Sequence, residues 1–251
     1  MSFFANFGLE PYQWILALVC AFIFGISKAG IKGIAIIAIP LMAIAFGGKA
    51  STGIVLPMLI MGDIFAVWYY SRHAQWGYLW KLLPWVLSGV LIGVWVGDKI
   101  PEALFKQIMA TIILLSVGIL FWWDRQKVKR IPNQRWFGIT MGLLVGFTTM
   151  VGNLAGPFAN IFFLAMQLPK EKFIGTTAWL FFIVNLFKVP FHLFVWGTIT
   201  VESFVLDLTL LPGILLGLFI GIRLVKYIKE HHYRQLILVL TAIGAILIFV
   251  Q

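Results

Sequence analysis

The segment 24–40, FGISKAGIKGIAIIAIP, places two lysines, Lys28 and Lys32, inside an otherwise apolar run. Gly30 and Gly33 interrupt this run before it resumes as a short apolar stretch. Glycine adopts backbone conformations that end a helix, and a lysine in an apolar setting costs free energy unless an anion compensates its charge. Broken helices form the substrate sites of many membrane transporters. We therefore expect this segment to contribute to an anion-binding site.

The composition is that of a membrane protein. Hydrophobic residues make up 61% of the 251 residues and charged residues only 11%, whereas a soluble domain has about 25% charged residues. The apolar runs lack the strict alternation of barrel strands, so helices are expected. The net charge of +10 comes from basic loops and does not indicate a nucleic-acid partner. The single cysteine, Cys20, excludes disulfides and cysteine-based metal sites, and we expect neither a cofactor nor a metal ion.

Ten apolar segments are expected to form helices, and two of them are unusually short. The segments are 12–27, 34–46, 52–70, 82–97, 105–123, 136–150, 157–167, 173–195, 204–225 and 236–250. The segments 34–46 and 157–167 are too short to cross about 30 Å of hydrocarbon. Each follows a glycine-rich break, so we expect half-helices of re-entrant hairpins or the second halves of discontinuous spans.

The two halves of the chain form an internal repeat. At one constant spacing, Gly30, Gly53 and Asp63 recur as Gly152, Gly175 and Asn185. At a second, slightly longer spacing, Pro84, Gly89 and Gly93 recur as Pro212, Gly217 and Gly221. Each repeat holds about five helical segments, an odd number, so the two repeats should lie inverted in the membrane.

The predicted fold class is therefore an all-α polytopic integral membrane protein. It has two inverted repeats, residues 1–123 and 136–251, joined by a basic cytoplasmic linker at 124–135. The broken or re-entrant short helices of the two repeats are expected to meet near mid-membrane, as in transporters with inverted repeats.

The basic loops predict the orientation. Cytoplasmic loops are rich in lysine and arginine, so the linker 124–135, DRQKVKRIPNQR, is placed in the cytoplasm. Alternation then leaves only Lys49, Lys99 and Lys106 among the loop cations on the opposite side. The chain is predicted to be a multi-pass protein of the cell (inner) membrane with both termini extracytoplasmic. The N-terminal sequence MSFFANFGLEPYQW has no basic residue, so the first segment is expected to be retained rather than cleaved as a signal peptide.

Three lysines and one clear acid, Asp63, remain inside the apolar segments. The lysines are Lys28, Lys32 and Lys188. Each intramembrane charge costs about 2.5–3.5 kcal/mol on insertion scales, which argues that the set has a function. Free backbone N–H groups at the half-helix N-termini near Gly33 and Pro157 would add to a positive interior.

These considerations give a set of candidate site residues. The candidate substrate-binding residues are Lys28, Gly30, Lys32, Gly33, Asn153, Gly156, Asn185 and Lys188. Asp63 and His192 are the candidate coupling or counter-ion groups. Because Asp63 and Asn185 are repeat counterparts, a pseudo-two-fold axis should bring them together. Lys188 follows Asn185 on the same helical face, so we expect Asp63 to neutralise Lys188 in the empty site.

Less specific interpretations stay open. Lys28 and Lys32 could extend to a membrane interface if the first break is a surface turn. Asp63 and Lys188 could form a purely structural ion pair, and His192 could be a core residue. The repeated glycines are expected to be helix-packing positions rather than site residues, and these are Gly89, Gly93, Gly217 and Gly221.

The chain resembles the TauE/SafE, or sulfite exporter, family of membrane permeases. The resemblance extends over nearly the whole chain and includes its two-repeat layout. In the first repeat it lies in Gly30, Gly33 and Pro40 followed by KASTG. In the second repeat it lies in Gly146, Gly152 and Gly156 followed by KFIGTT. It implies transport of sulfite, organosulfonates or related sulfur-containing anions.

The favoured function is a secondary transporter of small sulfur-containing anions that works by alternating access. The alternatives are a passive anion channel and a transporter of a different small organic anion. An enzyme is not expected, because the sequence has no paired acids, no His-rich motif and no nucleophile with an accompanying base. The expected partners are the anionic substrate and the lipid bilayer, and a homodimer remains open.

Overall fold

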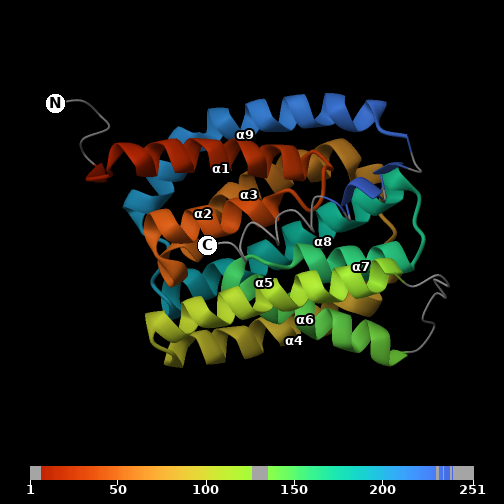
Figure 1. The fold of residues 1–251 in the computed structure, drawn as a ribbon, viewed down its shortest axis with the longest axis horizontal. Coiled ribbons are helices and arrows are strands. Elements are labelled where there is room, and N and C mark those ends of the chain that lie inside the picture. The colour runs from red at the N-terminus through yellow and green to blue at the C-terminus, as the bar shows by residue number, and fades with distance from the viewer. Residues whose placement is uncertain (1–6, 126–134, 230–231, 234, 238, 240–251) are drawn as a thin grey trace.

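The computed structural model describes residues 7–125, 135–229, 232–233, 235–237 and 239, and its regular structure is entirely helical in these ranges. The elements are α1 (Pro11–Lys28), α2 (Ala35–Phe46), α3 (Gly48–Tyr70), η2 (Ser71–His73), α4 (Trp76–Lys99), α5 (Glu102–Arg125), α6 (Arg135–Gly152), α7 (Gly156–Ala165), α8 (Lys170–Pro190), η3 (Phe191–Val195) and α9 (Val201–Tyr227). Figure 1 shows them as a bundle whose long helices run roughly along one direction.

The bounds of the helices up to α9 agree with those of the expected apolar segments to within six residues. Among the described residues, five helical stretches are long and apolar enough to cross a membrane: α1, α3 with η2, α4, α8 with η3, and α9. The all-α polytopic fold class is therefore confirmed. Most of the expected segment 236–250, the termini and residues 126–134 of the predicted linker lie outside the described residues.

The two short helices fold back as hairpins instead of continuing a span. The Gln13 side chain, near the start of α1, donates to the carbonyl of Ala45, near the end of α2, at 2.6 Å. Phe137 at the start of α6 likewise stacks on Phe162 near the end of α7, with ring centroids 5.9 Å apart. Each short helix thus returns toward the end of the bundle from which its partner came (Figure 1). At 1.5 Å per residue, α2 and α7 are only about 18 and 15 Å long.

Helices from the two halves of the chain pack against each other through glycines. A Cβ atom added at Gly146 of α6 would overlap the carbonyl oxygen of Val86 in α4, and one added at Gly217 of α9 would overlap that of Phe22 in α1. Glycine at such positions lets helix backbones approach closely. The expectation that Gly89 and Gly217 are packing positions is confirmed, since a Cβ at Gly89 would overlap the Leu143 carbonyl.

Helices α3 and α8 cross the centre of the bundle in opposite directions. Gly53 near the start of α3 lies against Thr198, just beyond η3, while Gly175 near the start of α8 lies against Tyr70 at the end of α3. Halfway along, the Asn185 amide of α8 donates to the Asp63 carboxylate of α3 at 2.8 Å. Polar groups therefore meet where both helices pass through the middle of the structure.

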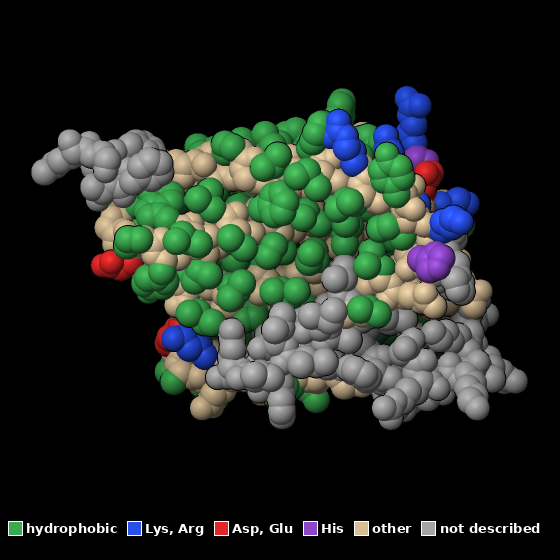
Figure 2. Space-filling model, turned by 45° about the horizontal axis from the view of Figure 1, so that its top comes forward, with side chains coloured by type: hydrophobic (Ala, Val, Ile, Leu, Met, Phe, Trp, Pro, Cys, Tyr) green, Lys and Arg blue, Asp and Glu red, His purple; other side chains and the backbone are tan. Residues whose placement is uncertain are grey.

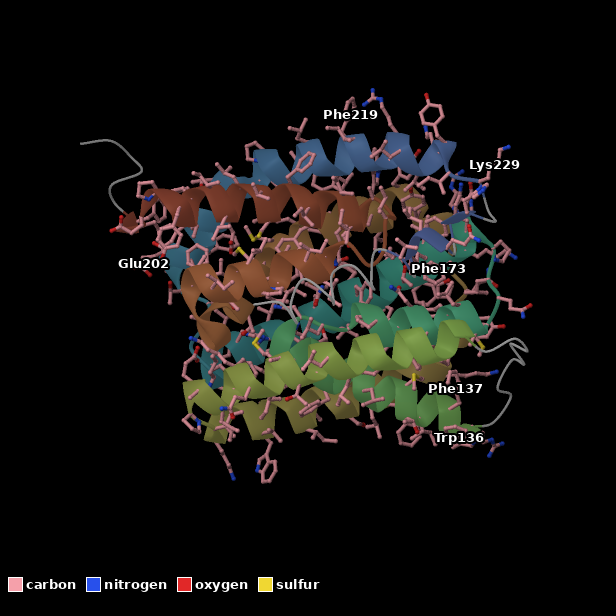
Figure 3. The ribbon with its side chains drawn as sticks, in the orientation of Figure 1. Trp136, Phe137, Phe173, Glu202, Phe219 and Lys229 are labelled. Carbon is pink, nitrogen blue, oxygen red and sulfur yellow. The ribbon has the colours of Figure 1, made fainter. Side chains whose placement is uncertain are left out.

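Charged side chains are concentrated at the ends of the bundle. In Figure 2 hydrophobic side chains cover the middle of the visible face, and most of the visible lysine, arginine and histidine side chains gather at one end. Figure 3 places Lys229 and Trp136 at one end and Glu202 at the other. Large apolar side chains on the outside, such as Trp68 and Phe219, are exposed. This distribution is typical of a helical bundle surrounded by lipid.

The close contact of α6 with α4 generates a test of the packing. Substitution Gly146→Ala should separate the two helices, because its Cβ would overlap the Val86 carbonyl, and should lower the free energy of unfolding by about 1–3 kcal/mol. Gly118→Ala in α5 is the matched control, since no atom of the described residues lies within 4 Å of a Cβ there. Its stability in detergent should stay within about 1 kcal/mol of the parent. Equal effects of both substitutions would contradict this account.

Candidate functional site

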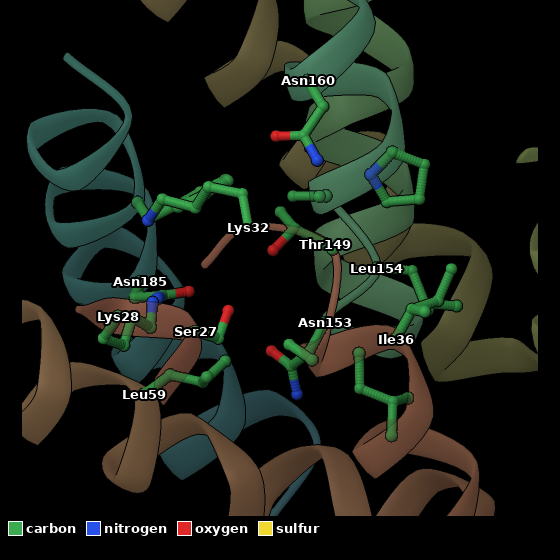
Figure 4. A pocket seen from close by; sticks show the side chains of 17 residues that line it. Ser27, Lys28, Lys32, Ile36, Leu59, Thr149, Asn153, Leu154, Asn160 and Asn185 are labelled. Carbon is green, nitrogen blue, oxygen red and sulfur yellow. The ribbon is translucent and has the colours of Figure 1, made fainter. Parts of the chain in front are cut away.

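A pocket lies between the tips of the two hairpins (Figure 4). Its walls come from the end of α1 and the following break, the end of α6 and the second break, the first residues of α2 and α7, and the central parts of α3 and α8. The space left by protein atoms there is about 610 Å³. The two broken regions predicted from the sequence therefore form one site.

Two glycines shape the first break. Gly30 and Gly33 have φ angles of 121° and 99°, a region that side-chain-bearing residues rarely adopt. The Tyr70 hydroxyl donates to the carbonyl of Ala29 at 2.8 Å, and the Tyr233 hydroxyl donates to that of Gly30. These bonds satisfy carbonyl groups that the end of α1 leaves without helical partners.

The start of α2 leaves its backbone donors free. The N–H groups of Gly33, Ile34 and Ala35 have no hydrogen-bond partner among the described residues, and Gly33 and Ala35 line the pocket. The N–H groups of such a first turn carry partial positive charge and suit an anion. This matches the half-helix N-terminus expected near Gly33.

The second break is built around Asn153, a non-glycine residue with a φ of 55°. Its amide group donates to the carbonyl of Thr52 at 3.1 Å, and its Oδ1 accepts from Lys188 at 2.5 Å. Beyond it, α7 begins at Gly156, with Pro157 in the first turn. The break is thus fixed to both α3 and α8 by one side chain.

A chain of polar contacts connects the two breaks through the centre of the bundle. Lys28 Nζ lies 2.6 Å from Asp63 Oδ1, and Asn185 Nδ2 donates to Asp63 Oδ2 at 2.8 Å. The Oδ1 atom of Asn185 lies 3.5 Å from Lys188 Nζ, which in turn binds Asn153. Asp63 and Lys188 are fully buried. Each hairpin is therefore tied by a lysine to the central helix pair α3–α8.

The expectation that Asp63 pairs directly with Lys188 is wrong. The salt-bridge partner of Asp63 is Lys28, while Lys188 is surrounded by the oxygens of Thr149, Asn153 and Asn185. Lys28 is the last residue of α1, and its side chain lies against Gly62 of α3, next to Asp63. Asn185 separates the carboxylate from Lys188, although all these groups do belong to one cluster. Lys28 is 5% exposed, which is inconsistent with a position at a membrane interface.

Lys32 differs from the other two buried lysines. Its side chain is 3% exposed and lines the pocket, and its Nζ lies 5.5 Å from the ring centroid of Phe181. It has no salt bridge and no hydrogen-bond acceptor among the described residues. Within this cluster, a single aspartate faces three lysines, so an anion in the pocket would offset the charge of a protonated Lys32.

His192 lies apart from the pocket. Its Nδ1 is 2.8 Å from the Thr198 hydroxyl, and its ring contacts Trp196 with centroids 5.1 Å apart. It is not among the residues that line the pocket. No group of three or more His, Cys, Asp and Glu side chains within the described ranges is arranged to hold a metal ion.

Several residues of the pocket were not predicted. Ser27, Thr149, Asn160 and Phe181 all line it. Ser27 and Thr149 stand at the same repeat spacing as Asp63 and Asn185, and this relation could have identified them. Asn160 could have been noticed as a polar residue inside the apolar stretch PFANIFF.

The Lys28–Asp63 contact generates a test by double substitution. Lys28→Met and Asp63→Asn should each lower the free energy of unfolding in detergent by about 3–5 kcal/mol, because each leaves a buried charge unpaired. The double variant should cost clearly less than the sum of the two. Lys106→Gln, which removes an exposed pair with Glu102 at 3.9 Å, is the control and should change stability by less than about 1 kcal/mol. Additive effects at Lys28 and Asp63 would argue against the pair.

Comparison with known proteins gives one match. Residues 15–248 match the protein family described as Sulfite exporter TauE/SafE. No curated protein and no solved structure matches the chain. The matched region includes both breaks and every residue of the pocket. Members of this family are membrane transporters of anions and not enzymes. The chain is a multi-pass membrane transporter that belongs to the TauE/SafE sulfite exporter family.

Proposed function

We propose that the protein is a secondary transporter of small sulfur-containing anions, such as sulfite or organosulfonates, and that it works by alternating access. The observation that carries this proposal is the position of Lys32. Its cation is buried, has no counter-ion among the described residues and lines the pocket between the hairpin tips. A substrate anion in this pocket would supply the missing counter-charge.

The backbone around the pocket would complete the anion site. Free N–H groups come from the start of α2, and those of Ala155 and Gly156, which also line the pocket, have no partner within the described part of the chain. Two half-helix N-termini would thus donate to the oxygens of one substrate. Lys28 is paired with Asp63, which favours Lys32 over Lys28 as the main substrate cation.

The distribution of pocket residues supports an inverted repeat. The two positions in the Asn185–Asp63 hydrogen bond are separated by 122 residues. The same spacing relates Ser27 to Thr149 and Leu59 to Phe181, and all four of these residues line the pocket. A pseudo-two-fold axis through the pocket would give each wall a counterpart from the other repeat, as in transporters with inverted repeats.

Contacts between helices of the two repeats also occur in corresponding pairs outside the pocket. Gly25 in α1 faces the carbonyl of Ile214 in α9, and Gly146 in α6 faces that of Val86 in α4. Each hairpin thus packs against a helix of the other repeat and is also tied to α3 or α8 by a lysine. Small rocking movements of the hairpins against these helices would open the pocket to one side at a time.

A passive anion channel is the second candidate, and the burial of the site argues against it. Lys32, Asp63 and Lys188 are 3%, 0% and 0% exposed, whereas a conducting pore needs a continuous path lined by accessible polar groups. Saturable uptake, exchange between substrate inside and outside the vesicle, and the absence of single-channel currents would favour the transporter.

Substitution of Lys32 tests the proposed binding site. In proteoliposomes with the protein reconstituted in the membrane, Lys32→Gln should raise the apparent KM for sulfite uptake by roughly tenfold or more, because the substrate loses a buried cationic partner. Lys99→Gln is the control, since its Nζ lies over the ring of Trp95 at the end of α4 and away from the pocket. If Lys32→Gln transports sulfite with the KM of the parent protein, Lys32 is not the substrate cation.

We further propose that the end of the bundle with Lys229 is cytoplasmic and that the end with Glu202 is extracytoplasmic (Figure 3). Cytoplasmic loops retain lysine and arginine. In a Cys20→Ser background, a cysteine at Lys49 should react with an impermeant reagent from outside intact cells, and one at Arg72 should react only after the membrane is opened. The reverse pattern would contradict this orientation.

A further inference from the structure

The side chain of Asn160 is the one amide at the pocket without a hydrogen bond among the described residues. Both its Oδ1 and its Nδ2 atoms are buried and have no partner, and the residue is 0% exposed. The other pocket amides are held, because Asn153 binds Lys188 and Thr52 and Asn185 binds Asp63. Buried polar groups in proteins are nearly always paired, so an unpaired amide beside a pocket is available to bind a ligand.

Packing does not explain an asparagine at this position. Asn160 lies in α7 between Ala159 and Ile161, and the other buried residues of this helix are all apolar. An alanine or leucine would serve such a position without leaving polar atoms unsatisfied. Figure 4 shows the Asn160 amide on α7 at the edge of the pocket, whereas the Lys32 side chain extends toward α8, where its Nζ lies 5.5 Å from the ring centroid of Phe181.

The amide adds a hydrogen-bond acceptor to a pocket whose charged groups are donors. Lys32 and the free N–H groups of α2 can only donate, so they suit the oxygens of an anion. The Oδ1 atom of Asn160 instead needs a donor from the ligand, and this holds in either orientation of the amide. A fully deprotonated oxyanion such as sulfite satisfies the donors and leaves this oxygen unpaired. An organic anion with a hydroxyl or amino group would satisfy both the donors and this acceptor.

We propose that Asn160 is a specificity-determining residue that accepts a hydrogen bond from a hydroxyl or amino group of an organosulfonate substrate. The inference rests on the proposed function, because it assumes that the pocket binds a sulfur-containing anion beside Lys32. It adds that an anion that carries a hydrogen-bond donor is preferred.

Three sulfonates that differ in one group test the inference by calorimetric titration of the purified protein in detergent. The probes are 2-hydroxyethanesulfonate, ethanesulfonate and 2-methoxyethanesulfonate, which carry a donor, no substituent and an acceptor of similar size. The parent protein should bind the hydroxyl compound roughly 2- to 10-fold more tightly than either of the others. In Asn160→Leu this preference should disappear, while ethanesulfonate should bind at least as tightly as before. Ile161→Val, which alters a buried residue of the same helix outside the pocket wall, should retain the preference.

The outcomes separate this inference from the proposed function. Equal binding of the three sulfonates by the parent protein overturns the role of Asn160 and leaves the anion transporter standing; this measurement needs no variant. A preference that persists in Asn160→Leu, or in Asn160→Ala if the leucine variant does not fold, also overturns it. Binding of sulfite without binding of 2-hydroxyethanesulfonate overturns the inference as well. If neither sulfite nor any sulfonate binds, the proposed function fails and the inference fails with it.

Discussion

Burial of positive charge is the constraint on which the rest of the structure depends. A lysine placed in an apolar interior must find a counter-charge or several oxygen ligands. The Asp63 carboxylate compensates the charge of Lys28, and a set of neutral oxygens surrounds Lys188. Lys32 receives neither in the described part of the chain. In the proposed function, this unpaired lysine makes the pocket an anion site, while the two compensated lysines connect the surrounding hairpins to α3 and α8.

The backbone provides the complementary half of the site. Each hairpin brings a helix N-terminus to the pocket, and these N-termini are positioned because α1 and α6 pack through glycine against helices of the other half of the chain. Free N–H groups at a helix N-terminus can bind an anion without the help of a charged side chain. In the proposed site, one lysine without a counter-ion among the described residues and two sets of backbone donors would attract an oxyanion without surrounding it by many charges.

The sequence was sufficient to predict the helices, the two breaks and the meeting of Asp63 with Asn185. The helices follow from long apolar runs and the breaks follow from glycine, and both are local properties of the sequence. The meeting of Asp63 with Asn185 follows from the repeat spacing. The partner of Asp63 was not predictable, because it depends on where the end of α1, which carries Lys28, lies against α3 in the folded protein. Asn160 was not predicted, because an amide in an apolar helix indicates a binding residue only when the helix is known to line a pocket.

The most direct test of the central claim is a structure determined with a selenium-containing oxyanion. Crystals of the protein soaked in selenite and measured at the selenium absorption edge would locate the anion without prior assumptions. The account predicts an anomalous peak between the two hairpin tips, with anion oxygens within about 4 Å of Lys32 Nζ, and no such peak in Lys32→Gln crystals. A bound selenite outside this pocket, with Lys32 unoccupied, would contradict the claim that Lys32 and the half-helix N-termini form the substrate site.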